Sequence, residues 1–210
     1  MWQGRFMKLA IYGSGGFGRE LVQAAREAVG PSGQVVFVSD DADQVGQTVC
    51  GLPVVGADQL DCPAVIAVGD PAVRRSIADR VTAAELSAPT HRRGPDVVVG
   101  EGAVFCDFTV VTASATIGRH FQCNIYSYVA HDCVIGDFVT FAPKVCCNGN
   151  VHIEDDVYVG TGAILRQGTA GKPLRIGKGA VIGMGAVVTK DVPPGATVIG
   201  NPAKPMEPRG

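Results

Sequence analysis

Residues 129–146 read as three consecutive hexads, VAHDCV, IGDFVT and FAPKVC, and this period of six residues decides the fold. An apolar residue stands at every sixth position from Val99 to Leu165, and after one interruption the count runs on from Ile176 to Val188. A period of six fits neither an α-helix nor an alternating strand. It indicates a solenoid of short strands, in which each hexad forms one face and three faces close a coil of eighteen residues.

Glycines follow the inward residue on one face of the predicted coil. They are Gly100, Gly118, Gly136 and Gly177, and they mark a corner that needs a residue without a side chain. Stacked coils bury a continuous core of small aliphatic residues. This core accounts for an ordered chain with 28 glycines and only 6% aromatic residues.

The hexad pattern resembles that of the hexapeptide-repeat acyltransferases. This resemblance implies a left-handed parallel β-helix, a homotrimer and acyl transfer from coenzyme A. The predicted fold class is therefore mainly β: a left-handed parallel β-helix over residues 94–210, preceded by a small Rossmann-like α/β domain over residues 1–93. The boundary is set by a change in composition near Gly94-Pro95. Residues 191–195 and 200–205 resemble the closing motif of this superfamily.

The first domain begins with the pattern strand, glycine turn, helix. A strand is predicted at residues 8–12, then the turn GSGGFG at 13–18, then a helix at 19–29. This G-x-G-x-x-G turn lets backbone N–H groups approach a phosphate. Further strands are predicted at 35–38 and 64–69, and a second helix at 72–86.

Two acidic residues follow the second predicted strand, where such folds hydrogen-bond a ribose or base. Together with the turn they give a predicted nucleotide site made of Gly13, Gly15, Gly16, Phe17, Asp40 and Asp41. A lone glycine turn is a weak signal, and an NAD-dependent dehydrogenase is the alternative reading of it. That alternative is disfavoured because the α/β half is short for a complete dinucleotide fold.

The two halves together resemble a narrower family, the bacterial sugar-nucleotide N-acetyltransferases of glycan synthesis and relatives named for sialic acid O-acetylation. The resemblance rests on the glycine turn, GLPVVG at 51–56 and VGDP at 68–71. It implies that the α/β domain holds a nucleotide-linked amino sugar and that the β-helix holds acetyl-coenzyme A. Many members have a histidine where this chain has Phe17, whose ring cannot donate a hydrogen bond.

Residues 128–137, YVAHDCVIGD, match the segment around the family's catalytic histidine. His131 takes an outward position, and Gly149 and Gln167 follow at steps of eighteen residues, so the three should form a column. The repeat is interrupted within residues 168–174, where the chain has five more residues than the period of six requires. This insertion lies at a corner above the column. Insertions in solenoids commonly line the working face.

His131 is the predicted general base, because an imidazole with an ordinary pKa of ~6.5 accepts protons near neutrality. Asp132 is expected to orient it, although neighbouring side chains on a strand point to opposite faces. The resemblance implies that the Gly149 N–H meets the thioester carbonyl. It also implies coenzyme contacts at Gly149, Thr140, Thr161, Met184 and Lys204.

Two other histidines are weighed separately. His120 is predicted to be a surface residue, and His152 is a further candidate for contact with substrate or coenzyme. Thr140 stands where the family often places a coenzyme-contacting histidine, and its hydroxyl replaces one hydrogen bond but no charge.

The leading hypothesis is an acetyl-coenzyme A-dependent N-acetyltransferase acting on a nucleotide-linked amino sugar. A sugar or sialic acid O-acetyltransferase is the nearest alternative, and a non-catalytic nucleotide-sugar-binding protein is a third. Sequence does not separate N- from O-acetylation, and it does not give the nucleotide, the sugar or the carbon that bears the amine.

Composition limits the partners and the compartment. A net charge of −2 gives no reason to expect nucleic acid or an anionic membrane. No apolar run is long enough for a signal peptide or a membrane span, so a cytoplasmic protein is expected. Seven cysteines are then expected to be reduced, with Cys123, Cys133 and Cys147 buried. Cys146-Cys147 has no further ligands at metal spacing, and no metal is predicted.

Overall fold

The computed structural model describes residues 6–206, and the chain divides into two compact units between Pro89 and Thr90. The sequence predicts this division after residue 93, which is four residues beyond the observed division after residue 89. Arg92–Arg93 (β7) already pairs with Val110–Val111 (β10), and the Gly94 N–H donates to the Val111 carbonyl at 2.9 Å. The change in composition at Gly94 therefore lies inside the first coil of the solenoid.

A five-stranded sheet in the order β3-β4-β2-β1-β5 forms the centre of the first unit. Its strands are β1 (Lys8–Tyr12), β2 (Gln34–Ser39), β3 (Thr48–Val49), β4 (Leu52–Gly56) and β5 (Ala64–Ile66). All neighbours are parallel except β3, which forms a short hairpin with β4. The chain passes from β1 to β2 and β4 on one side of β1, and then crosses to β5 on the other side. The carboxyl end of β1 is therefore the switch point where such sheets bind ligands.

The first predicted helix, at residues 19–29, is divided in two and begins earlier, at Gly16, whereas the second is shorter than the sequence predicts. The helices of the first unit are α1 (Gly16–Glu20), α2 (Val22–Val29), the 3₁₀ helix η1 (Ala57–Gln59) and α3 (Pro71–Ala78). The Asp70 carboxylate caps α3 by accepting the Val73 N–H at 2.9 Å. The predicted end of α3 near residue 86 is wrong, because the chain leaves the helix to pair with β5. There the Ala64 N–H donates to Thr82 and the Ala84 N–H donates to Ala64, both at 2.9 Å. Strand β6 (Leu86–Ser87) follows.

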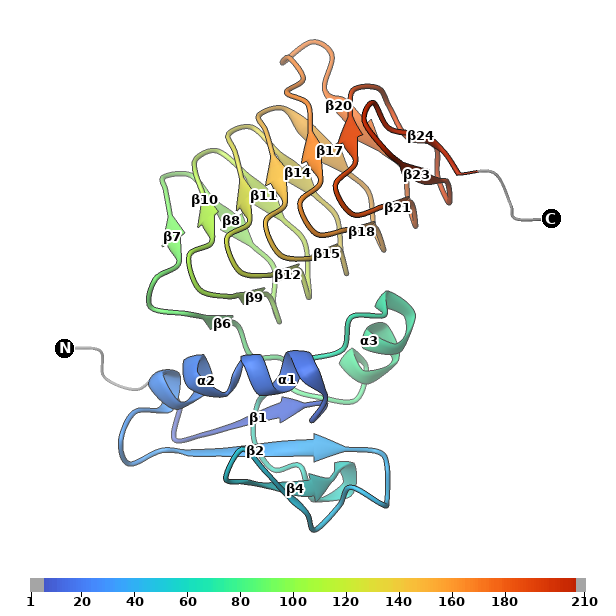
Figure 1. Ribbon diagram of the computed structural model, residues 1–210. Coiled ribbons are helices and arrows are strands. Elements are labelled where there is room, and N and C mark those ends of the chain that lie inside the picture. The colour runs from blue at the N-terminus through green and yellow to red at the C-terminus, as the bar shows by residue number, and fades with distance from the viewer. Residues whose placement is uncertain (1–5, 207–210) are drawn as a thin grey trace. The chain divides into compact units, whose positions relative to one another are not determined.

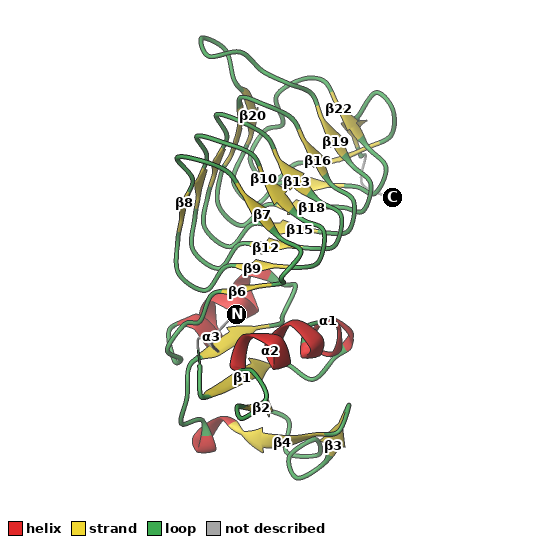
Figure 2. Cartoon of the chain, turned by 90° about the vertical axis from the view of Figure 1, so that its left-hand side faces the viewer, coloured by secondary structure: helices red, strands yellow, loops and turns green. Residues whose placement is uncertain are grey.

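The second unit is a stack of triangular coils with one sheet along each face, visible in Figures 1 and 2. Face 1 contains β7, β10, β13 (Tyr128–Val129), β16 (Cys146–Cys147), β19 (Ile164–Leu165) and β22 (Val187–Val188). Face 2 contains β8 (Val98–Val99), β11 (Thr116–Ile117), β14 (Val134–Ile135), β17 (Val151–Ile153) and β20 (Leu174–Ile176). Face 3 contains β9 (Val104–Phe105), β12 (Gln122–Cys123), β15 (Thr140–Phe141), β18 (Tyr158–Val159), β21 (Val181–Ile182), β23 (Thr197–Ile199) and β24 (Lys204–Pro205).

The register of these sheets confirms the coil of eighteen residues. Val111 pairs with Val129, Val129 with Cys147, and Cys147 with Leu165, all in parallel. Every predicted inward residue from Phe105 onward is at most 2% exposed, and together they form one continuous core. The predicted burial of Cys123, Cys133 and Cys147 is confirmed.

The corners of the coils use two different residue positions. A Cβ on Gly118 would stand 2.5 Å from the carbonyl carbon of Gly136, so the predicted glycine column exists because adjacent coils approach closely there. The left-handed backbone falls two residues later, as at His120 (φ 52°) and Phe138 (φ 58°).

Within residues 6–206, no helix combines the length and the apolar character that a membrane crossing requires.

Candidate active site

The predicted column of His131, Gly149 and Gln167 is present at the corner between face 1 and face 2. The Asn150 N–H donates to the His131 carbonyl at 3.0 Å, and the Gly168 N–H donates to the Gly149 carbonyl at 2.9 Å. These bonds hold three successive corners in register, one coil apart.

His131 and Asp132 are joined by a hydrogen bond although they are neighbours in sequence. His131 Nδ1 lies 2.7 Å from Asp132 Oδ2, and the two side chains are 48% and 55% exposed. Asp132 is a corner residue with φ 57°, so the alternation that holds along a strand does not apply to it. Because a carboxylate only accepts hydrogen bonds, the proton of the neutral imidazole is on Nδ1. Nε2 therefore carries the free lone pair.

Gly149 lies directly against this imidazole. A Cβ built on Gly149 would stand 2.5 Å from both Nε2 and Cε1 of His131. Within residues 6–206 the Gly149 N–H donates no hydrogen bond. A basic nitrogen and a free backbone donor thus occur side by side, which is the pair of groups that acyl transfer needs.

The strands below this corner are fixed by a second polar pair, which the sequence does not reveal. The Tyr128 hydroxyl donates to Asn148 Oδ1 at 2.9 Å, and Asn148 Nδ2 donates to the Leu165 carbonyl at 2.8 Å. Burial, followed by the neighbouring thiol of Cys146, raises the pKa of Tyr128 to about 12. Tyr128 is therefore a protonated donor at neutral pH and holds the residue before Gly149.

The predicted insertion extends from the corner one coil above Gly149. It forms a loop between β19 and β20 (Figure 1), in which Thr169 and Lys172 exchange two backbone hydrogen bonds of 3.0 Å. Its residues 169–172 are exposed. A Cβ on Gly168 would stand 2.6 Å from the Leu174 nitrogen, so the loop leaves the corner through a position that has room only for glycine.

The predicted coenzyme contacts fall into separate places on the β-helix. Thr161 and Met184 stack at the corner between face 3 and face 1, where the Gly185 N–H donates to the Thr161 carbonyl at 2.8 Å. Met184 is 82% exposed. Thr140 is on face 3 and 6% exposed, and Lys204 is exposed at the end of the same face on β24. Only Gly149 lies at the His131 corner.

In the first unit the glycine turn has two kinds of glycine. Gly13 has φ 106° and its N–H donates to the Val38 carbonyl at 2.9 Å, while a Cβ on Gly18 would collide with the Gly13 carbonyl. These two glycines maintain the turn. A Cβ placed on Gly15 or Gly16 would have no atom within 4 Å, so the backbone of these two residues faces open space. Phe17 beside them is half-buried.

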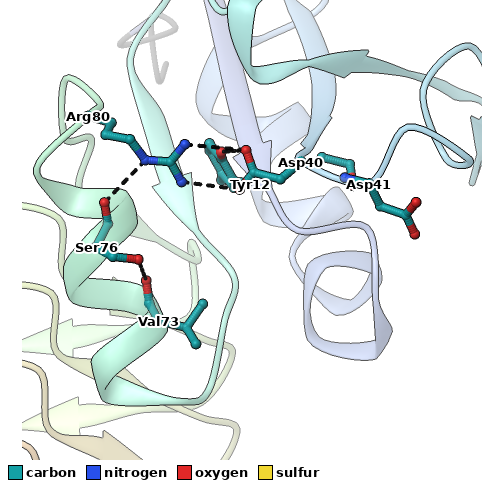
Figure 3. A network of polar contacts seen from close by, with 7 residues as sticks. Tyr12, Asp40, Asp41, Val73, Ser76 and Arg80 are labelled. Atoms are coloured by element: carbon teal, nitrogen blue, oxygen red, sulfur yellow. Dashed lines mark hydrogen bonds and ion pairs between the residues drawn. The ribbon is translucent and has the colours of Figure 1, made fainter.

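Asp40 is engaged by two residues that the sequence does not single out (Figure 3). Its Oδ1 accepts the Tyr12 hydroxyl at 2.7 Å, and Arg80 Nη2 lies 3.1 Å from Oδ2. Hydrogen bonds from Arg80, then from Tyr12, lower the pKa of Asp40. Burial, then the bond to Asp40, raises the pKa of Tyr12 to about 12. The Asp40 carboxylate, which follows β2, thus links β1 through Tyr12 and the segment after α3 through Arg80.

Asp41 belongs to a different network, centred on Gln44. Gln44 Oε1 accepts the Ser14 hydroxyl at 2.5 Å, and Gln44 Nε2 donates to Asp41 Oδ2 at 2.9 Å. The Asp43 N–H donates to Asp41 Oδ1 at 3.0 Å. Gln44 therefore connects the glycine turn to the carboxylate after β2.

The surface position predicted for His120 is wrong. Its ring is 2% exposed and stacks on Phe138, one coil above, with ring centroids 5.0 Å apart. His152 faces outward on β17, and burial followed by the charge of Arg175 lowers its pKa. Across the part of the chain that the structure describes, no three His, Cys, Asp or Glu side chains are grouped to hold a metal ion.

Comparison with known proteins gives consistent matches over the whole chain. The PglD N-terminal domain family matches residues 8–81. A GDP-perosamine N-acetyltransferase of Escherichia coli O157:H7 is 41% identical over 212 residues, covering 94% of this chain and 95% of that protein. The solved structure of WeeI from Acinetobacter baumannii AYE has a TM-score of 0.89 and 43% identity, covering 96% of this chain and 100% of that one.

A second solved structure is the acetyltransferase domain of PglB from Neisseria gonorrhoeae FA1090 in complex with acetyl coenzyme A. It has a TM-score of 0.83 and 33% identity, covering 95% of this chain and 99% of that one. Together these likenesses confirm the predicted fold class and reaction class. The protein belongs to the hexapeptide-repeat sugar N-acetyltransferases, with the left-handed parallel β-helix and the Rossmann-like first unit of that family.

Proposed function

We propose that the protein transfers the acetyl group of acetyl-coenzyme A to the amino group of a nucleotide-linked amino sugar, and that a GDP-linked amino sugar is its substrate. The GDP-perosamine N-acetyltransferase that is 41% identical supports the acceptor, and the acetyl-coenzyme A complex of the PglB domain supports the donor. The observation that carries the proposal is the position of His131 Nε2 against Gly149, whose N–H is free within residues 6–206.

The proposed chemistry uses three residues of this corner. The amine nitrogen attacks the thioester carbonyl carbon, and His131 Nε2 accepts the proton that the nitrogen loses. Asp132 stabilises the resulting imidazolium through the 2.7 Å contact at Nδ1. The Gly149 N–H stabilises the negative charge on the carbonyl oxygen. The C–N bond forms, the C–S bond breaks, and the leaving thiolate takes the proton from His131.

We assign the coenzyme to a cleft between two protomers of a homotrimer. Thr161 and Met184 stand at one edge of face 1 and the His131 corner stands at the other, so two copies side by side bring these edges together. Apart from Arg92 and Tyr128, the outward residues of face 1 that cover such an interface are apolar, and Ile164 among them is 40% exposed. Thr140 and Lys204 complete the proposed coenzyme contacts. A protein that sediments as a monomer while fully active contradicts this assignment.

In this proposal the glycine turn binds the diphosphate and the sugar side of the nucleotide. The turn residues assigned to this contact are Gly13, Gly15, Gly16 and Phe17. Both proposed substrates are charged nucleotides that do not cross membranes unaided, and we therefore assign the reaction to the cytoplasm.

The test measures thiol release from acetyl-coenzyme A with GDP-, UDP- and dTDP-linked amino sugars and with sialic acid, followed by mass spectrometry of the product. Turnover with a nucleotide-linked amino sugar, lost in His131→Gln, is the expected result. Turnover with sialic acid alone would contradict the proposal and indicate a sialic acid O-acetyltransferase. Nucleotide binding without any turnover would contradict it as well and indicate a non-catalytic nucleotide-sugar-binding protein.

A further inference from the structure

The corner between face 3 and face 1 changes character along the stack. One position of this corner has a left-handed backbone in every coil, and its residues in chain order are Phe108, Tyr126, Lys144, Gly162 and Gly185. A Cβ on Gly162 or Gly185 would have no atom within 4 Å, so the corner is bare backbone in the two coils that carry Thr161 and Met184. In the first two coils the same position carries aromatic rings instead.

The rings of Phe108 and Tyr126 stack on each other and remain open to solvent. Their centroids are 5.1 Å apart with an interplanar angle of 8°, and each residue is 53% exposed. Both have φ 59°, a backbone that is unfavourable for a bulky residue, so the turn itself does not call for an aromatic side chain. Phe138 at another corner is 1% exposed and packs on His120. The Phe108–Tyr126 pair, in contrast, leaves its ring surface to a ligand.

Tyr126 and the proposed base stand at opposite edges of face 1 in the same coil. Tyr126 precedes β13 by two residues, and His131 follows the end of β13 by two (Figure 2). Thr161 and Met184, the proposed coenzyme contacts, lie two and three coils further along the corner of Tyr126. The coenzyme thus comes from later coils, and Tyr126 with Phe108 lies on the side that is left to the acceptor.

The two edges meet only between protomers. In a trimer with face 1 turned toward the threefold axis, the Tyr126 edge of one protomer adjoins the His131 edge of the next. Rotation about an axis parallel to the stack keeps equal coils at equal heights. Tyr126 of one protomer therefore faces His131 of its neighbour, where the amine attacks the thioester.

The chemistry of the acceptor selects its part that reaches this place. The amine is on the sugar, so the sugar ring, rather than the base or the diphosphate, lies beside His131. One side of a pyranose ring is lined with C–H groups, which pack on an aromatic ring while the hydroxyl groups at the rim remain hydrated or hydrogen-bonded.

We infer that Tyr126 is a platform on which each protomer holds the amino-sugar ring of the acceptor bound at the His131 corner of its neighbour. Phe108 is a positioning residue, because its ring stacks on Tyr126 from the coil before and fixes the plane of that ring. The inference rests on the proposed function, since it assigns the sugar contact of the same reaction.

The first experiment measures steady-state kinetics with a GDP-linked amino sugar, the proposed acceptor, at saturating acetyl-coenzyme A. Tyr126→Asn removes the ring and keeps the corner, because Asn accepts a left-handed backbone, as Asn150 does at φ 55°. We expect the KM of the acceptor to rise about 10-fold, with kcat and the KM of acetyl-coenzyme A nearly unchanged. Phe108→Leu should raise it by less. Tyr126→Phe, which restores the ring, should recover most of the lost affinity.

Val98→Asn is the control for loss of exposed apolar surface. Val98 is 64% exposed on face 2, away from both edges of the proposed cleft, and its replacement leaves the KM of the acceptor unchanged. Melting curves and sedimentation of each variant show that the compared proteins are folded and trimeric.

The second experiment tests whether Tyr126 and His131 act from different protomers. Chains with His131→Gln and chains with Tyr126→Asn are co-expressed and purified as mixed trimers. Some sites then combine an intact His131 from one chain with an intact Tyr126 from the other, so turnover with the KM of the parent protein is expected to reappear. If both residues of a site came from one protomer, no site would hold both.

Each contrary outcome removes a stated part. An unchanged acceptor KM in trimeric Tyr126→Asn removes the platform and leaves the proposed function intact. A trimer that dissociates in Tyr126→Asn reduces the aromatic pair to a contact between protomers. Failure of Tyr126→Phe to recover affinity removes the stacking role, and failure of the mixed trimers removes the contribution from the neighbour. Absence of turnover in the parent protein overturns the proposed function and this inference with it.

Discussion

The Nε2 edge of His131 rests on the α-carbon of Gly149, one coil above it, where a Cβ would stand 2.5 Å from the ring. This contact joins the proposed base and the proposed oxyanion donor, which lie on neighbouring coils of the stack. Their relative position is set by backbone bonds between the coils, such as that from Asn150 to His131 at 3.0 Å. The proposed site is therefore preorganised by the repeat itself.

Replacing His131 with Gln removes the proposed base and keeps a polar side chain. Because the side chain is 48% exposed, we expect an unchanged melting temperature and a kcat lower by about 10² to 10⁴. Steady-state thiol release with saturating acetyl-coenzyme A measures the change. An unchanged kcat would falsify the role of His131.

Gly149→Ala tests the contact between the two coils. The backbone of Gly149 is not left-handed, so the methyl group itself is tolerated but displaces the imidazole. We expect a fall in kcat of about 10², the usual cost of a misplaced catalytic group. Gly171→Ala is the control, since nothing lies within 4 Å of a Cβ there. In a His131→Ala background, Gly149→Ala should cost less stability than it does alone, as measured by urea unfolding of the double-mutant cycle.

Asp132→Asn separates the charge of this residue from its shape. Asn accepts the left-handed backbone found at Asp132, so the corner is preserved. Loss of a hydrogen bond to a charged group is worth ~1.5 to 3 kcal/mol, and we expect kcat to fall by about 10- to 100-fold. Both KM values should change little. A KM increase with kcat intact would instead indicate a binding role for Asp132.

The Asp40–Arg80 pair gives a prediction about pH. The pKa of Asp40 is lowered in the folded protein, so its contribution to stability is present above the ordinary carboxyl pKa of ~3.9 and is lost as the pH falls through the lowered value. Arg80→Gln should lower the free energy of unfolding at pH 7 by less than ~1 kcal/mol, since both side chains are about half exposed. The difference from the parent should shrink below about pH 4. A difference that grows on acidification contradicts the pairing.

Gly118→Ala tests the close approach of the coils without touching the site. Its Cβ would meet backbone atoms of Gly136 and Asp137 at 2.5 to 2.6 Å, and neither coil can move freely. We expect a loss of about 1 to 3 kcal/mol in the free energy of unfolding, as for overpacking in a core. Urea denaturation monitored by circular dichroism measures it. A neutral effect, equal to that of Gly171→Ala, indicates that the coils relax apart.

The β-helix and its proposed catalytic column follow from the amino-acid sequence alone. Inward residues such as Val129 and Cys147 repeat with the coil, so counting in sixes and eighteens places each residue on its face. The same count placed Gly149 above His131 and located the inserted loop. Such contacts are predictable because each coil repeats the geometry of the previous one, and burial of one aliphatic residue per face fixes the register.

The contacts that individual polar side chains make depend instead on the folded chain. His120 follows the repeat at a corner, yet the Phe138 ring buries it, and Asp132 turns toward His131 because its corner backbone is left-handed. Asp40 is bound to Arg80, forty residues away, because the chain after α3 returns beside β5. A periodic pattern specifies which face a residue takes. Side-chain rotation at a corner, and hydrogen bonds between segments outside the repeat, depend on neighbours that only folding brings together.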